Sequence, residues 1–276
     1  MRLEFLHTPR KRFGQNFLQD AGTIQKIIRY LHPNNEEKVL EIGPGLGALT
    51  TPLLEIVNHL DVVEIDRELV ARLKTIFPTS KLTVHQQDAL TFDLESFTKQ
   101  YPSFKKLRLI GNLPYNISTP LLFHFFKFSR LIEDMHFMLQ KEVADRLSAN
   151  PHQKNYGRLS IMTQYYCKVV PLFTVDSSAF YPKPKVQSVF IRLVPHSVLP
   201  NPVDDVLLFQ TVIQTAFNQR RKTLANALKT YLTAEDYITL NIQPTLRPEA
   251  LSLKDFIQIT NFISQRLNHP IEHKFL

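Results

Sequence analysis

Four consecutive residues, Asn112-Leu113-Pro114-Tyr115, combine groups that could act on the amino group of a planar ring. They follow the apolar run LRLIG, which predicts a buried strand that ends at Asn112. The Asn112 side-chain oxygen and the Leu113 carbonyl can each accept one N–H of the amine, and so stabilise charge that develops on its nitrogen during attack. Pro114 stiffens the backbone, and the Tyr115 ring offers a stacking surface. The tetrad therefore predicts a site that positions an aromatic amine as a nucleophile.

Three earlier strand ends carry residue types that suit a nucleoside ligand. The chain has only seven glycines, and three of them fall within residues 43–47, where a strand is expected to turn into a helix and a ligand could approach the backbone. The next strand ends in Glu64, which could accept hydrogen bonds from ribose hydroxyls, and Asp88 follows the strand after that. Because parallel strands end at the same edge of a sheet, these groups and Asn112 are expected to share one pocket.

A dinucleotide site is an alternative interpretation of the glycine-rich turn. Gly43, Gly45 and Ala48 satisfy the pattern G-x-G-x-x-G/A, which is typical of NAD-binding proteins. The acid at the third strand end argues against NAD, since glycines, two acids and an amide in order fit a nucleoside with a short cationic tail better than a pyrophosphate. Helix caps and turn formers would explain Asp88 or Asn112 singly, but they explain the ordered set much less well.

The pattern of short apolar runs and amphipathic stretches predicts an α/β fold of the Rossmann type with a mostly parallel sheet. Strands are expected at 38–42, 60–65, 81–87, 107–112, 135–139 and 186–194, and helices at 49–57, 67–77, 119–128, 141–147 and 156–170. After a proline-rich stretch near 195–203, only helices are expected, at 206–218, 221–232, 234–240 and 253–267. This predicts an N-terminal basic segment (1–37), a main α/β domain (38–198) and a small helical C-terminal domain (199–276).

The net charge of +8 is concentrated in two short parts of the chain. Residues 1–30 carry six Lys or Arg against two acids, and residues 216–230 carry four basic residues and no acid, so each segment has a charge of +4. A neutral body with two basic patches indicates a polyanionic partner such as RNA or DNA. The alternative is that these side chains simply solvate the surface.

The remaining composition narrows the class of protein. Cys167 is the only cysteine, which excludes an internal disulfide and fits a reducing cytoplasm. The ten histidines are scattered without paired spacing, so no metal site is expected. No apolar run approaches the roughly 20 residues of a membrane span, and the N-terminus does not resemble a signal peptide. We expect a cytoplasmic, monomeric protein.

The motifs EIGPGLGALT (41–50), VEID (63–66), QQDAL (86–90) and NLPY (112–115), in this order, resemble those of S-adenosylmethionine-dependent RNA adenine dimethyltransferases. RFGQNFL (12–18), AFYPKPKVQS (179–188) and FNQRRKTL (217–224) extend the resemblance over nearly the whole chain, toward the bacterial KsgA-type enzymes that act on small-subunit ribosomal RNA. Many amino-group methyltransferases have Asn/Asp-Pro-Pro-Tyr at this place. This chain departs from that pattern with Asn-Leu-Pro-Tyr, and the dimethyltransferases share the departure.

The resemblance implies S-adenosylmethionine as the cofactor and assigns residues to it. Glycines at the turn line its methionine part, Glu64 holds the ribose, Asp88 holds the adenine, and residues of the N-terminal segment close over the ligand. The cofactor-binding residues implied in this way are Asn16, Leu18, Gly43, Gly45, Glu64, Asp88, Ala89 and Asn112.

The target adenosine must be unpaired or flipped out of a duplex to reach such a pocket. Phe180 is the candidate for a second aromatic wall against the base, and the alternative for Phe180 is an ordinary core position. Phosphate contacts are expected from the two basic clusters, namely Arg10, Lys11, Arg12, Arg220, Arg221 and Lys222.

The implied reaction is dimethylation of the amino nitrogens of two adjacent adenosines. These adenosines lie in the hairpin loop near the 3′ end of 16S ribosomal RNA, within the assembling small subunit. Two alternatives are a methyltransferase that acts on large-subunit ribosomal RNA, and a ribosome-assembly factor in which catalysis is secondary.

Overall fold

The chain is described by a computed structural model, which places residues 9–10, 14–199, 201–218 and 222–268. Within these ranges, no helix is both long enough and apolar enough to cross a membrane. The chain forms two compact units. The first contains residues 1–144 and 168–195, and the second contains residues 145–167 and 196–276.

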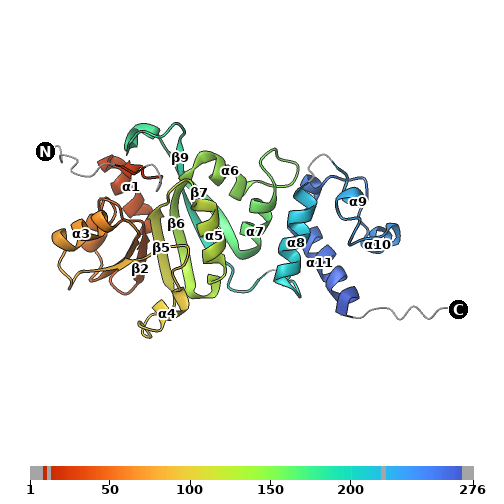
Figure 1. Ribbon diagram of the computed structural model, residues 1–276, viewed down its shortest axis with the longest axis horizontal. Helices are drawn as coiled ribbons and strands as arrows, with labels where there is room; N and C mark the ends of the chain where they lie inside the picture. The colour runs from red at the N-terminus through yellow and green to blue at the C-terminus, as the bar shows by residue number, and fades with distance from the viewer. Residues whose placement is uncertain (1–8, 11–13, 200, 219–221, 269–276) are drawn as a thin grey trace. The chain divides into compact units, whose positions relative to one another are not determined.

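The first unit is built on a seven-stranded sheet (Figure 1). Its strand order is β4-β3-β2-β5-β6-β9-β7, in which the first five strands are parallel and β9 runs antiparallel to β6. The strands are β2 (Lys38–Ile42), β3 (Leu60–Glu64), β4 (Leu82–Gln86), β5 (Leu107–Asn112), β6 (Ile132–Gln140), β7 (Cys167–Val175) and β9 (Ser188–Pro195). Nearly every side chain of β2, β3 and β5 is buried, as expected for central strands of a parallel sheet covered on both faces.

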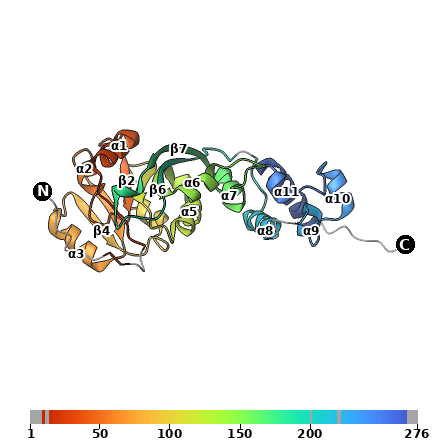
Figure 2. The same cartoon turned by 90° about the horizontal axis from the view of Figure 1, so that it is seen from above.

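Helices cover the two faces of this sheet, and Figure 2 shows α1 and α5 on opposite sides of the strands. Asp20 and Asp66 cap the N-termini of α1 and α3 by accepting hydrogen bonds from backbone N–H groups of the first turn. The helices are α1 (Ala21–Leu31), α2 (Thr50–Leu54), α3 (Arg67–Ile76), α4 (Leu94–Thr98) and α5 (Ser118–Phe126), with 3-10 turns η2 (Ser129–Leu131) and η3 (Ser177–Ala179). Helix α6 (Lys141–Ser148) begins in the first unit and ends in the second.

A short two-stranded ribbon joins the N-terminal segment to a distant part of the first unit. Strand β1 (Phe17–Leu18) pairs antiparallel with β8 (Phe180–Tyr181), so that Phe17 lies opposite Tyr181. Leu18 and Phe180 are both buried in the main hydrophobic cluster, together with residues of α1, α2 and the central strands. The ribbon therefore fixes the N-terminal segment against the sheet.

The second unit is helical in its described residues. It contains α7 (Arg158–Tyr166), α8 (Val206–Phe217), α9 (Leu224–Ala227), α10 (Ala234–Thr239), η4 (Pro248–Ala250) and α11 (Leu253–Asn268). Aromatic contacts join α7, α8 and α11, with ring centroids 4.9 Å apart for Tyr165 and Phe209 and 5.8 Å apart for Phe217 and Phe256. The Tyr156 hydroxyl donates a hydrogen bond of 2.9 Å to the Leu251 carbonyl, so its buried polar atom is satisfied.

The α/β prediction with a mostly parallel sheet is confirmed, but two predicted helices are wrong in part. The stretch 156–170 is a helix only to Tyr166, and β7 then begins at Cys167 because the β-branched run that follows adds a strand beside β9. The stretch 221–232 contains only α9 in its described part, since the N–H groups of Leu224 and Ala225 bond carbonyls of residues 246 and 244 instead of a preceding helical turn.

The two units divide the chain differently from the predicted domains. Residues 145–167, which precede the last two strands of the sheet, cluster with the C-terminal helices. The sequence pattern did not indicate this grouping, because it depends on packing between helices that are far apart in the chain.

Gly111 of β5 lies against the backbone at the end of β2. A methyl group at its Cα would lie 2.4 Å from the carbonyl oxygen of Ile42, well inside van der Waals contact. That oxygen belongs to the backbone at the end of β2, so it cannot rotate away. Gly111 therefore allows the strands that carry the glycine turn and Asn112 to lie side by side.

We expect Gly111→Ala to lower the free energy of unfolding by at least about 2 kcal/mol, because the added methyl group overpacks a rigid contact. Urea unfolding measures this change. Gly22→Ala in α1 is the matched control, since its nearest neighbour would lie 3.5 Å away, and it should be neutral or stabilising by up to about 1 kcal/mol. Equal stability of the Gly111 variant and the parent would contradict the close approach.

Candidate active site

The candidate site lies at the carboxyl ends of the parallel strands, where the strand order reverses between β2 and β5. Open α/β sheets bind ligands at this position. A cavity of about 310 Å³ opens there, lined by residues that follow β2, β3, β4 and β5 and by residues 14–18 of the N-terminal segment. This volume lies within the usual range for small-molecule sites, roughly 300–1,000 Å³. All lining residues belong to the first unit.

The glycine-rich turn after β2 forms one wall of the cavity. Gly45 has a φ of +57°, and a methyl group on its Cα would lie 3.0 Å from the Phe17 ring. Both the backbone conformation and the space therefore favour glycine here. Phe17 belongs to β1, so the turn and the N-terminal segment are in direct contact.

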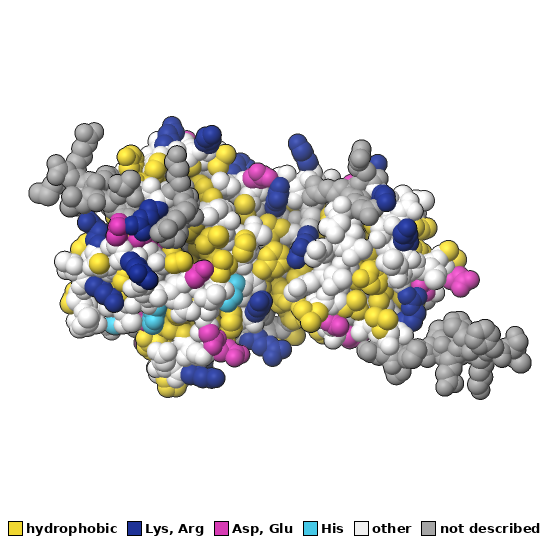
Figure 3. Space-filling model, in the orientation of Figure 1, with side chains coloured by type: hydrophobic (Ala, Val, Ile, Leu, Met, Phe, Trp, Pro, Cys, Tyr) yellow, Lys and Arg dark blue, Asp and Glu magenta, His cyan; other side chains and the backbone are white. Residues whose placement is uncertain are grey.

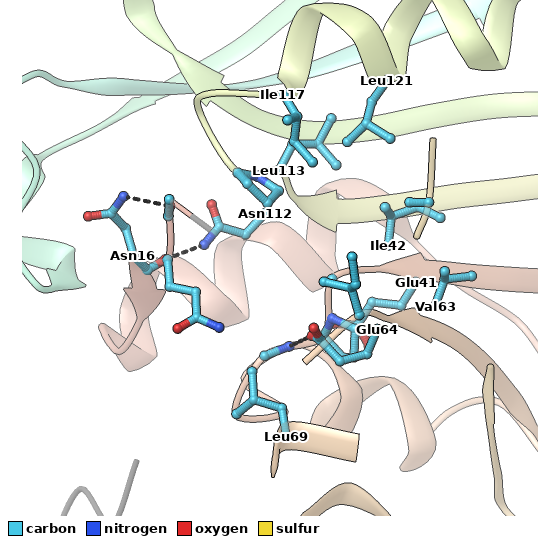
Figure 4. Close-up of a pocket in the computed structure, with 18 of the residues that line it drawn as sticks. Asn16, Glu41, Ile42, Val63, Glu64, Leu69, Asn112, Leu113, Ile117 and Leu121 are labelled. Carbon is cyan, nitrogen blue, oxygen red and sulfur yellow. Dashed lines mark hydrogen bonds between the residues drawn. The ribbon is translucent and has the colours of Figure 1, made fainter. Parts of the chain in front are cut away.

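Glu64 ends β3 and points into the cavity beside this turn (Figure 4). Its carboxylate accepts hydrogen bonds from the backbone N–H of Gly45 at 3.3 Å and of Asp66 at 2.9 Å. Burial raises the pKa of the Glu64 carboxyl, although these two bonds act in the opposite direction. The bonds fix a buried acceptor at the place where ribose hydroxyls were predicted to bind.

A second buried acid, Glu41, also lines the cavity, and the sequence analysis did not single it out. Thr50 donates a hydrogen bond of 2.7 Å to its Oε2 atom. Burial raises the pKa of Glu41 to about 8, with Glu64 adding a smaller repulsive contribution. The signal that could have indicated this residue is its place in the strand KVLEI, directly before the glycine turn.

Asp88 and Ala89 line the cavity from the loop after β4. Asp88 Oδ1 accepts a hydrogen bond of 2.9 Å from the backbone N–H of Leu90, which orients the carboxylate. Of the described residues that line the cavity, none is Lys, Arg or His, whereas three are acidic. The cavity therefore suits a cationic ligand, and the acids close to the glycine turn would repel a pyrophosphate, which argues against a dinucleotide site.

Asn112 ends β5, and its side chain is oriented by the N-terminal segment. The Nδ2 atom donates a hydrogen bond of 2.7 Å to the backbone carbonyl of Asn16 (Figure 4). Because only the nitrogen of the amide can donate to a carbonyl, this bond decides which way the amide faces. The Oδ1 atom is then kept as an acceptor on the other side of the amide group.

The N-terminal segment is attached to the turn after β3 as well. Gln15 donates a hydrogen bond of 3.2 Å to Asp66, and the Arg10 guanidinium lies 3.3 Å from Asp66 and also pairs with Glu68. Arg10 was predicted to contact phosphates, but the structure places it against these two carboxylates. Its position holds the segment beside the cavity.

Tyr115 begins the turn that follows Leu113 and Pro114, and all three residues line the cavity. Its hydroxyl is 2.7 Å from the Oγ atom of Ser188, the first residue of β9. Burial raises the pKa of the Tyr115 phenol, so the group is neutral at neutral pH. The loop after β5 is thereby tied to the start of β9.

The structure brings most of the predicted site residues together in one cavity. These are Asn16, Leu18, Gly43, Gly45, Glu64, Asp88, Ala89, Asn112, Leu113, Pro114 and Tyr115. Phe180 is instead 4% exposed within the hydrophobic cluster and does not line the cavity, while its neighbour Tyr181 is 48% exposed. Stacking of a base on Phe180 stays a prediction.

The predicted phosphate contacts fall largely outside the described residues. Lys11, Arg12, Arg220 and Arg221 lie there, and Lys222 is exposed in the second unit. Their contact with nucleic acid also stays a prediction.

The strand order, the glycine turn and the acidic cavity define a methyltransferase of class I. Two solved structures share this architecture. The dimethyladenosine transferase from Plasmodium falciparum superposes with a TM-score of 0.75 and 25% identity, over 91% of this chain and 98% of that chain. The 23S rRNA methyltransferase ErmE superposes with a TM-score of 0.67 and 21% identity over 91% of this chain and 100% of that chain, a likeness of fold alone.

The sequence narrows the class to one family. The family model described as ribosomal RNA adenine dimethylase matches residues 6–265. The ribosomal RNA small subunit methyltransferase A of Marinomonas sp. (strain MWYL1) is 49% identical over 261 residues, 94% of this chain and 97% of that protein. The protein of the same name from Actinobacillus pleuropneumoniae serotype 5b (strain L20) is 53% identical over 260 residues, 93% of this chain and 90% of that protein. The chain belongs to the ribosomal RNA adenine dimethylase family and is an RNA-methylating enzyme.

The buried carboxyl of Glu41 should make stability depend on pH in the protein without ligand. A carboxyl whose pKa is about 8 in the folded state and about 4.3 when unfolded binds its proton more tightly in the folded state. The free energy of unfolding should therefore fall as pH rises between these two values, by at most about 1.4 kcal/mol per pH unit from this group. Glu41→Gln, which can still accept from Thr50, should remove this contribution.

Urea unfolding of the parent and Glu41→Gln between pH 5 and pH 8.5 measures the effect. The slope of the unfolding free energy against pH should differ between the two proteins. This difference reports on Glu41 alone, because every other titrating group is common to both. Parallel profiles would show that the carboxyl is not held protonated.

Proposed function

We propose that the enzyme transfers methyl groups from S-adenosylmethionine to the N6 atoms of two adjacent adenosines, in the 3′-terminal hairpin loop of 16S ribosomal RNA in the assembling small subunit. The observation that carries the proposal is the position of Asn112 and Tyr115 at one wall of a cavity whose charged lining residues, among those described, are all acidic. The names of relatives that are about 50% identical over nearly the whole chain support the small subunit as the target.

The residues of the cavity fit S-adenosylmethionine. When bound, this cofactor supplies a methyl group attached to a positively charged sulfur. Three acidic side chains, Glu41, Glu64 and Asp88, line the cavity, and no basic side chain is among its described lining residues. A bound cation would stabilise the ionised forms of these acids, so the cavity favours the cofactor over its neutral demethylated product. Glu64 would accept from the ribose hydroxyls, and Asp88 and Ala89 would bind the adenine edge. Asn16 and Leu18 would cover the ligand from the N-terminal segment.

The residues Asn112-Leu113-Pro114-Tyr115 would position the target base. The Asn112 Oδ1 atom and the Leu113 carbonyl would each accept one N–H of the amine, which favours the nitrogen geometry that has its lone pair free. Charge that develops on the nitrogen is then stabilised by groups already in place. The neutral amine needs no general base before attack. Tyr115 would hold the base by stacking, and positioning would supply much of the rate.

The basic clusters would contact the RNA backbone. Figure 3 shows Lys and Arg side chains distributed over both units on the face in view. With a net charge of +8, the protein would gain affinity from phosphate contacts that carry no sequence information. Selection of the target would then depend on the shape of the hairpin and on access of an unpaired adenosine to the pocket.

Labelled S-adenosylmethionine tests the target directly. Unmethylated small subunits, naked small-subunit RNA and large-subunit RNA are offered to the enzyme separately, and the labelled nucleoside is identified. We expect dimethyladenosine in the small-subunit particles. Label in large-subunit RNA would overturn the assignment to the small subunit, and no label in any RNA would favour a role in subunit assembly without catalysis.

We expect Asn112→Ala to slow methyl transfer on the order of 10²–10³-fold, because one acceptor for the developing charge is lost. Single-turnover rates measure this loss, and calorimetry should show nearly unchanged cofactor affinity. Glu64→Ala should instead abolish cofactor binding. Asn58→Ala, an exposed amide in the turn before β3, is the matched control and should behave as the parent. A parental rate for Asn112→Ala would rule out the proposed role of its amide.

A further inference from the structure

Ser188 is a buried polar residue at a position where an apolar side chain would be expected. It begins β9, is fully buried, and precedes the buried residues Val189 and Phe190. Its backbone lies opposite Gln140 at the end of β6. A buried hydroxyl costs free energy unless it is hydrogen-bonded, so its partner explains its presence.

That partner is the hydroxyl of Tyr115, whose oxygen lies 2.7 Å from Ser188 Oγ. The two residues are 73 positions apart in the sequence, and Tyr115 lies in the turn after β5 whereas Ser188 begins β9. Burial keeps the phenol neutral by raising its pKa, so either hydroxyl can donate to the other. The bond fixes the far end of the Tyr115 ring, while the turn at Pro114 fixes its near end.

We propose that Ser188 is a positioning residue for the target base, which acts by holding the Tyr115 ring at one tilt beside the cavity. The proposal rests on the proposed function, in which Tyr115 stacks against the adenine. A ring free to rotate about its χ angles would present its face to the base for only part of the time. A ring held at both ends keeps the base, and with it the amine, aligned for transfer. Ser188 itself does not contact the base.

The location of Ser188 adds a second consequence. The segment Tyr181–Gln187, which is exposed over most of its length and carries Lys183 and Lys185, leads directly into Ser188. At its other end, Tyr181 pairs with Phe17 of the N-terminal segment. An RNA that moves this exposed segment would therefore also move Ser188 and, through its hydrogen bond, the Tyr115 ring.

The test is a double-mutant cycle of Ser188→Ala and Tyr115→Phe, measured with single-turnover rates on unmethylated small subunits. Each single variant should lower the rate about fivefold to tenfold, as expected for the loss of one hydrogen bond that aligns a group. Because both remove the same bond, the double variant should be no slower than either single one. Cofactor affinity by calorimetry should stay at the parental value. The effect should therefore appear in the rate of methyl transfer and not in cofactor binding.

Two further variants separate positioning from a general loss of packing. Ser188→Thr keeps the hydroxyl and should restore most of the rate. Ser160→Ala is the matched control, since Ser160 is a fully buried serine of the second unit whose hydroxyl donates to the Arg146 carbonyl at 2.6 Å. It should lower the unfolding midpoint while leaving the rate unchanged.

The outcomes distinguish this inference from the proposed function. A slow Tyr115→Ala enzyme with a parental Ser188→Ala rate would overturn the role of Ser188 alone. Parental rates for both Tyr115→Ala and Ser188→Ala would overturn the stacking role of Tyr115 as well. Additive losses in the cycle would show that the two hydroxyls act separately. If Ser188→Ala does not fold, Tyr115→Phe removes the same bond from the other side, and a parental rate for that variant overturns the proposal.

Discussion

The hydrogen bond from Asn112 Nδ2 to the Asn16 carbonyl is the interaction on which the geometry of the site depends. It joins the end of a central strand to a segment near the start of the chain, 96 residues away. This bond leaves the amide oxygen free to accept an N–H from the target amine. A flipped amide would instead present its own N–H groups to the N–H groups of the amine, and these donors would repel each other. A single bond thereby determines whether this side chain can stabilise charge on the target nitrogen.

The segment that supplies this carbonyl is held in place by several independent contacts. The β1–β8 ribbon buries Leu18 and Phe180 in the core, Gln15 and Arg10 bond the acids after β3, and Phe17 packs over the glycine turn. The same ribbon leads through Tyr181 to Ser188 and thus to Tyr115. The cofactor wall, the amide acceptor and the aromatic ring are therefore parts of one connected structure, and none of these groups is positioned by its own loop alone.

The acids of the cavity distinguish it from the dinucleotide sites that the same type of fold carries in other proteins. Glu41 and Glu64 lie side by side in a poorly solvated place, and both have a raised pKa because burial disfavours their charged forms. A cation in the cavity would relieve this cost, whereas a pyrophosphate would increase it. The glycine turn alone is compatible with either ligand, and the acids around it make the distinction.

The sequence alone determined the class of fold, and its local patterns placed glycines, two acids and an amide at the edge of the sheet where the cavity lies. Alternating apolar runs define the strands, and the glycines, Glu64, Asp88 and Asn112 stand at their ends. Only the tertiary structure decided the rest. It divided 156–170 between α7 and β7, buried Phe180 in the core, turned Arg10 toward carboxylates, and brought Asn16 to Asn112 and Ser188 to Tyr115. These features depend on contacts between residues distant in the chain, and a local pattern carries no information about which distant partner a side chain meets.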